Sequence, residues 1–146
     1  MKKITLIIAL MISLCANAQM VFTDKIQTDE YEDIISYEEQ RTLIEMTDSS
    51  FIIKEKGKWL YSEYIIVGQE TRGSKNNVIE LNDLGTYGYE YLFAVIEKSK
   101  IRNYSVKDVE CIQIRYISSS KYSYIFSNML FIITTTNGCK IVYMRE

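Results

Sequence analysis

The stretch Met129-Leu-Phe-Ile-Ile-Thr-Thr-Thr-Asn-Gly-Cys-Lys-Ile-Val-Tyr-Met-Arg145 decides the fold, because two apolar, β-branched runs flank an Asn-Gly dipeptide. Asn137 and Gly138 supply the two positive-φ residues of a type I′ turn. The stretch therefore predicts a tight antiparallel hairpin with a two-residue loop.

A two-residue loop also sets the register of this hairpin, pairing Ile133 with Val142 and Phe131 with Met144. One face of the hairpin then carries these four side chains. The opposite face is apolar as well, with Leu130, Ile132, Ile141 and Tyr143. A hairpin that is apolar on both faces is expected to lie inside a sheet rather than at its edge.

Upstream of the hairpin, short β-type runs recur at intervals of about 8 to 12 residues. These runs are Thr42–Met46, Phe51–Glu55, Trp59–Val67, Val78–Leu81, Tyr89–Glu97 and Cys111–Ile117, followed by the aromatic run Tyr122–Phe126. Ser105–Asp108 has the spacing of a helix capping box. The pattern predicts an all-β fold, an antiparallel sandwich or a small meander barrel of roughly 7–9 short strands with at most one short helix.

The N-terminus has the pattern of a secretory signal peptide. Lys2 and Lys3 precede an apolar run from Ile4 to Leu14, and Ala16 and Ala18 occupy the small-residue positions of a cleavage site. The run is too short for a transmembrane helix, which needs about 20 residues. We therefore expect residues 1–18 to be removed and the mature chain to carry no transmembrane anchor. A lipid-modified Cys15 is the alternative, but Leu14 stands where a lipobox has a small residue.

The mature chain, residues 19–146, is expected to form a single β domain with an acidic N-terminal arm at about 19–41. Seven acidic residues fall within 24–39, against Lys25 as the one base. Removing Lys2 and Lys3 leaves 15 basic against 19 acidic residues, a net charge of −4. This balance argues against nucleic acid as a partner. We expect an exported bacterial protein of the periplasm or extracellular space.

Two residue types are missing from the whole chain, histidine and proline. Without histidine there is no Ser-His or Cys-His nucleophile pair and no imidazole metal ligand. Segments 68–75 and 118–121 resemble a phosphate-binding loop and a Ser-x-x-Lys motif, but neither leads into the helix that these motifs require. The sequence thus predicts no catalytic residue, no metal site and no cofactor.

Tyrosine is the remaining signal, with 12 in the chain. Tyr87, Tyr89 and Tyr91 share one face of a strand beside a turn, so they are the predicted contact residues for a protein or glycan partner. Packing between strands is the alternative use of these rings.

Cys111 and Cys139 are the two cysteines of the mature chain, and an oxidising compartment permits a disulfide between them. They lie at the same end of the sheet if Cys111–Ile117 pairs directly with residues 129–136. If Tyr122–Phe126 is a full intervening strand, they lie at opposite ends and cannot form a bond.

Three functions remain open. The first is a non-catalytic exported β domain with a binding or structural role in the cell envelope. The second is a small barrel that carries an apolar ligand, suggested by strands that are apolar on both faces. The third and weakest is a hydrolase that uses carboxylates such as Asp83 and Glu90.

Overall fold

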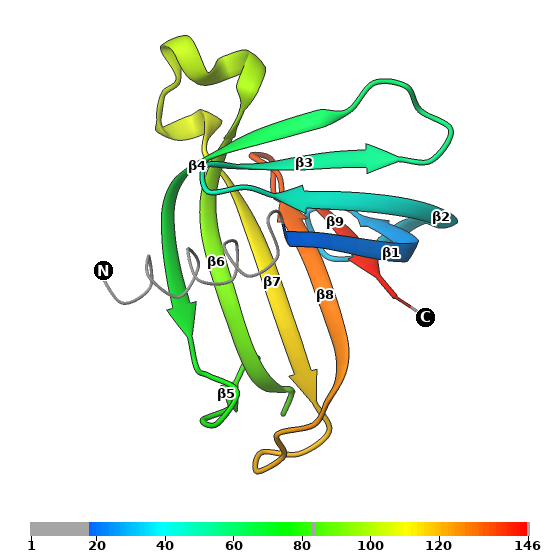
Figure 1. Ribbon diagram of the computed structural model, residues 1–146, viewed down its shortest axis with the longest axis vertical. Helices are drawn as coiled ribbons and strands as arrows, with labels where there is room; N and C mark the ends of the chain where they lie inside the picture. Colours follow the sequence, from blue (N-terminus) through cyan, green and yellow to red (C-terminus); the bar gives the residue numbers. More distant parts are fainter. Residues whose placement is uncertain (1–17, 83, 146) are drawn as a thin grey trace.

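A computed structural model describes residues 18–82 and 84–145, and nearly all of its regular structure is antiparallel β-sheet (Figure 1). The strands are β1 (Ala18–Thr28), β2 (Ile34–Met46), β3 (Ser50–Glu55), β4 (Ser62–Arg72), β5 (Ile79–Glu80), β6 (Tyr87–Glu97), β7 (Glu110–Ser118), β8 (Phe126–Thr134) and β9 (Lys140–Met144). Two 3-10 segments, η1 (Lys98–Asn103) and η2 (Val106–Asp108), connect β6 to β7. None of the helical segments in the described residues is long and apolar enough to cross a membrane.

Eight of the strands close into a barrel. The pairing order is β4-β3-β2-β1-β9-β8-β7-β6, and β4 then pairs with β6 to complete the circle. The ninth strand, β5, pairs with the start of β6 beyond the end of β4. Because neighbours in the barrel follow one another along the chain almost throughout, the fold is an up-and-down barrel. Of the sandwich and the barrel that the sequence left open, the structure is therefore the barrel.

Phenylalanine rings fill the middle of the barrel. Alternate side chains of each strand point inward, and Phe22, Phe51, Phe93 and Phe131 are the largest of those that are completely buried. Phe51 lies edge-on to Phe93, with ring centroids 4.9 Å apart, and to Phe131 at 5.5 Å. This packed layer separates the interior into two ends with different chemistry.

The end at which β3 stops is polar inside. A bulge in β1 between Phe22 and Asp24 shifts the alternation, so that Lys25 pairs with inward-facing Tyr143. Lys25 Nζ lies 2.8 Å from Glu55 Oε1, which also accepts a hydrogen bond of 3.0 Å from the Tyr143 hydroxyl. The other carboxylate oxygen accepts from Gln40 Nε2 at 2.9 Å. We call Lys25, Gln40, Glu55 and Tyr143 the polar plug.

The closing hairpin, β8–β9, lies inside the sheet between β7 and β1, as predicted. Its predicted register is wrong by one residue, because Ile133 pairs with Ile141 and Phe131 pairs with Tyr143. The consequence is that Tyr143 and Ile141 pack against the core, while Val142 and Met144 take the other face.

The turn of this hairpin explains the error. Gly138 N–H donates to the Thr135 carbonyl at 3.0 Å, and Thr135 N–H donates to the Cys139 carbonyl at 2.9 Å. Gly138 has a φ of 89°, but Asn137 is not among the residues with positive φ. These features define a three-residue loop, a type I turn followed by a bulge at glycine. Asn137 instead uses its side-chain oxygen to accept from the Thr135 hydroxyl and the Cys139 N–H.

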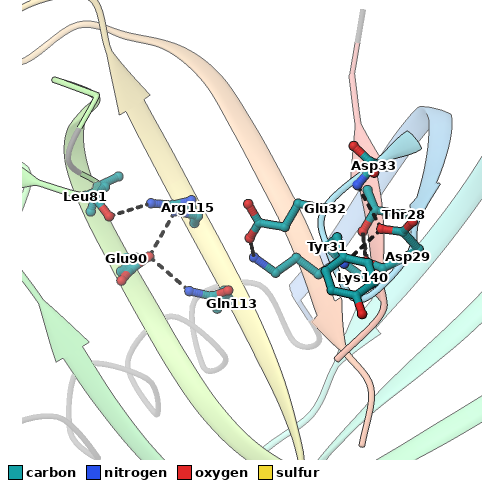
Figure 2. A network of polar contacts seen from close by, with 10 residues as sticks. All are labelled: Thr28, Asp29, Tyr31, Glu32, Asp33, Leu81, Glu90, Gln113, Arg115 and Lys140. Carbon is teal, nitrogen blue, oxygen red and sulfur yellow. Dashed lines mark hydrogen bonds and ion pairs between the residues drawn. The ribbon is translucent and has the colours of Figure 1, made fainter. Parts of the chain in front are cut away.

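The acidic segment 24–39 forms the far half of β1, the turn and the start of β2, where residues 34–39 pair with β1 but not with β3. Some of the acidic residues of this segment stabilise that turn. Asp29 Oδ1 accepts hydrogen bonds of 2.9 Å from the N–H groups of Tyr31 and Asp33, and Glu32 pairs with Lys140 of β9 (Figure 2).

Two smaller elements differ from what the sequence predicts. Ser105 and Asp108 form the expected capping box, but it opens the short 3-10 segment η2 rather than an α-helix. The run Tyr122–Phe126 is not a strand, because residues 119–125 form the loop between β7 and β8. β7 therefore pairs directly with β8.

Candidate ligand-binding pocket

The three predicted contact tyrosines lie on β6, but not on an outer surface. Tyr87, Tyr89 and Tyr91 alternate in phase with Phe93 and Val95, which are buried in the core. Their rings therefore point toward the concave side of the barrel. Each is half-buried, which places the set at the open end of the interior, opposite the polar plug.

Strand pairing gathers further rings around these tyrosines. Tyr89 pairs with Tyr116 of β7, and the two rings stack with centroids 4.6 Å apart and planes 13° from parallel. Phe126 of β8 lies edge-on to Tyr89, with ring centroids 5.0 Å apart. Tyr91 also lies edge-on to Tyr89, with ring centroids 6.0 Å apart. We call Tyr89, Tyr91, Tyr116 and Phe126 the aromatic cluster.

Close contact between β6 and β7 at this point depends on Gly88. A Cβ atom at Gly88 would lie 1.8 Å from the Tyr116 carbonyl oxygen, and its φ of 156° is itself unfavourable for residues with a side chain. Glycine therefore permits the approach that stacks the two tyrosines.

The phenol groups of the cluster stay protonated at physiological pH. Burial, together with the neighbouring Tyr116 and Tyr91, raises the pKa of Tyr89 to about 12. Burial also raises the pKa of Tyr91 and of Tyr116. The cluster thus presents uncharged rings to anything that enters the barrel mouth.

A cavity of about 260 Å³ lies beside the aromatic cluster. It opens where β9 has ended, leaving β1 and β8 unpaired with each other. The described residues that line it come from six parts of the chain and are mostly apolar. They are Ala18, Gln19, Met20, Met46, Tyr91, Phe93, Ile114, Tyr116, Met129 and Arg145. A second hollow of about 310 Å³ shares Tyr116, Met129 and Arg145 with it and adds Phe126, Ser127 and Asn128.

Of the two carboxylates considered for hydrolysis, Asp83 lies outside the described residues. Glu90 is 1% exposed and is bound by two arginines, with Arg72 Nη1 and Arg115 Nε each 3.0 Å from a carboxylate oxygen. Arg115 also donates to the Leu81 carbonyl at 3.1 Å (Figure 2). These contacts give Glu90 a structural role, which is to fasten the segment after β5 to the outside of the barrel.

No group of three or more histidine, cysteine or acidic residues in the described ranges is arranged to hold a metal ion. The segment 68–75 contains the end of β4 and a turn, and 118–121 contains the end of β7 and a turn. Neither leads into a helix, so neither has the context of the motif that it resembles.

Cys111 and Cys139 are both free thiols in the structure. Cys111 pairs with Thr134 of β8, and Cys139 follows the turn that leads from β8 into β9, so both lie at the same end of the sheet. β8 lies between them, which implies a Cα separation of two strand spacings, about 10 Å. A disulfide requires about 7 Å or less, so the bond needs a movement of the backbone. Burial raises the pKa of the Cys111 thiol.

Sequence reasoning missed most of the pocket lining, in particular Met20, Met46, Met129 and Arg145. These residues lie far apart in the sequence and share no motif. One signal was available. Met20 and Phe22 alternate along β1, and Ile44 and Met46 alternate along β2, which marks the inward faces of these two strands.

Comparisons of this chain with protein-family models, with curated proteins and with solved structures each give no match.

Proposed function

We propose that this protein is an exported, non-catalytic binding domain, and that its ligand is a small apolar molecule held at the open end of the barrel. The observation that carries the proposal is the cavity of about 260 Å³, whose wall is built from aromatic rings, methionines and an isoleucine. Ligand sites in proteins are commonly concave, mostly apolar and fitted with a few polar groups.

The size of the cavity sets the size of the ligand. A cavity of about 150 Å³ holds a benzene ring, so this cavity of about 260 Å³ has room for about ten non-hydrogen atoms. At about −0.5 kcal/mol per atom, such a ligand binds with about −5 kcal/mol, a dissociation constant between micromolar and millimolar.

Methionine methyl groups offer a direct test. Met20, Met46 and Met129 line the cavity, whereas Met144 belongs to the opposite face of β9 and serves as an internal control. In protein with isotopically labelled methionine methyls, titration with 1-octanol is expected to shift the three pocket signals and leave that of Met144 in place. Equal shifts at all four, or none up to the solubility limit, would contradict the proposal.

A pair of variants strengthens the test. Met129→Trp adds volume at the cavity wall and is expected to abolish octanol binding. Leu130→Trp adds a similar volume on the opposite face of the same strand, so it is expected to bind octanol as the parent protein does. Unchanged binding in Met129→Trp would place the octanol site elsewhere.

A second candidate is glycan or protein binding through a different surface. Trp59 is 91% exposed and Tyr61 is 59% exposed, and they line a hollow of about 580 Å³ with Glu63, Glu97 and Lys98. Flat rings beside charged groups suit a polar partner. Because Trp59 is the single tryptophan, its fluorescence reports on this hollow directly. A change upon addition of oligosaccharides that is lost in Tyr61→Ala would support this role, and an unchanged spectrum would count against it.

A further inference from the structure

Arg145 occupies the junction of the two hollows at the open end of the barrel. It follows β9 directly and lines both the apolar cavity and the neighbouring hollow that contains Ser127 and Asn128. Its Nε atom donates a hydrogen bond of 3.0 Å to the Val21 carbonyl of β1. This bond holds the guanidinium across the gap between β1 and β8.

The charge at this junction is uncompensated within the part of the chain that the structure describes. Arg145 is the one ionised side chain among the described residues that line either hollow, since the tyrosines are neutral. Arg72 and Arg115 both pair with Glu90, whereas the described ion pairs include none with Arg145. Among the described residues, the rim of this apolar cavity therefore carries a single positive charge, in a protein that is acidic overall.

The remaining hydrogen-bonding capacity of Arg145 suits an anion. Its Nε donates to Val21, and no hydrogen bond among the described residues uses its two Nη groups, which are suited to bind a carboxylate or a sulfonate. The side-chain amide of Asn128 provides a further donor in the same hollow.

We infer that the ligand is a small amphiphilic anion, with its apolar body in the cavity and its acidic group on Arg145. This inference rests on the proposed function and adds the chemical class of the ligand. It excludes neutral hydrocarbons and organic cations as the preferred occupants.

Three probes that share one alkyl tail test the inference, namely octanoate, 1-octanol and octylammonium. Binding is measured at neutral pH through the methyl signals of Met20, Met46 and Met129. We expect octanoate to bind about tenfold more tightly than octanol, because a hydrogen bond to a charged group is worth about that factor. Octylammonium is expected to bind more weakly than octanol.

Arg145→Met keeps the aliphatic stem and removes the charge. In this variant we expect octanoate to lose its advantage over octanol, so that the ratio of the two affinities falls from about tenfold to about one. Arg102→Met removes an exposed arginine from η1, which lines neither hollow, and is expected to keep the full preference for octanoate.

The outcomes separate this inference from the proposed function. Octanol binding without a preference for octanoate, or a preference that survives in Arg145→Met, overturns the inference and leaves the apolar pocket standing. If none of the three probes shifts the pocket methyls, the proposed function itself fails.

Discussion

Removal of Lys25 should destabilise the barrel far more than removal of a surface lysine. Lys25 and Glu55 form an ion pair of 2.8 Å with side-chain exposures of 8% and 12%. Breaking a buried pair by deleting one partner costs about 3 to 5 kcal/mol, because the other charge stays buried. Glu55 keeps hydrogen bonds from Tyr143 and Gln40 and an ion pair with Lys58, so we expect the lower end, about 3 kcal/mol.

The measurement is urea unfolding at pH 7, checked by thermal unfolding. For Lys25→Met a loss of about 3 kcal/mol corresponds to a fall in Tm of about 10 °C in a protein of this size. The matched control is Lys54→Met, because Lys54 pairs with Glu45 at 3.3 Å with 48% of its own side chain exposed. That surface pair is expected to contribute about 0.5 kcal/mol or less.

A double variant isolates the cause. Lys25→Met combined with Glu55→Gln removes both charges while leaving an amide that still hydrogen-bonds to Tyr143, so most of the lost stability should return. The reasoning is refuted if Lys25→Met costs no more than Lys54→Met, or if the double variant is less stable than Lys25→Met.

The same carboxylate predicts how stability changes with pH. Burial alone would raise the pKa of Glu55, but hydrogen bonds from Lys25, Lys58 and Tyr143 outweigh it and lower the pKa from 4.5 to about 2. A carboxylate with a lowered folded-state pKa stabilises the protein above its unfolded pKa. This contribution should therefore be complete above about pH 5 and disappear as the pH falls toward 2, with a smaller acid-induced loss in Glu55→Gln.

Three shorter predictions concern the backbone, the thiols and the N-terminus. Gly88→Ala should lower the free energy of unfolding by several kcal/mol, because its Cβ would meet a carbonyl oxygen of β7 at 1.8 Å. Gly85 has open space around it, so Gly85→Ala should lower the free energy of unfolding by only about 1 kcal/mol in the same urea experiment. Cys111 and Cys139 should both react with iodoacetamide in native protein, and a mass gain of two protons upon reduction would contradict this. N-terminal sequencing of exported protein should begin at Gln19, and a chain that retains Met1 would show that the leader is not removed.

How far the sequence could predict the fold depends on how local each signal is. The strands after Thr42 were predictable because alternation and turn residues act over a few positions. β1 was not, because its first residue, Ala18, coincides with the end of the leader pattern and acidic turn residues interrupt the alternation toward β2. The hairpin register failed because Asn137 makes side-chain bonds that favour a three-residue loop over the expected type I′ turn.

The pocket was less predictable than the fold. Tyr91 lines the cavity, whereas the sequence predicted it as a contact residue on an exposed face, because alternation alone does not say which side of a strand is concave. Closure of β4 onto β6 decides that side, and it joins residues far apart in the chain. Arg145 carried no signal at all, since its role follows from where β9 ends beside β1.

The packed phenylalanine layer and the polar plug also determine how molecules exchange at the pocket. Phe22, Phe51, Phe93 and Phe131 fill the middle of the barrel, so the described residues leave no passage from the cavity to the plugged end. A ligand must then depart by the route along which it arrived, and a second molecule cannot displace it from behind. Replacement of one ligand by another should proceed at the dissociation rate of the first, whatever the concentration of the second.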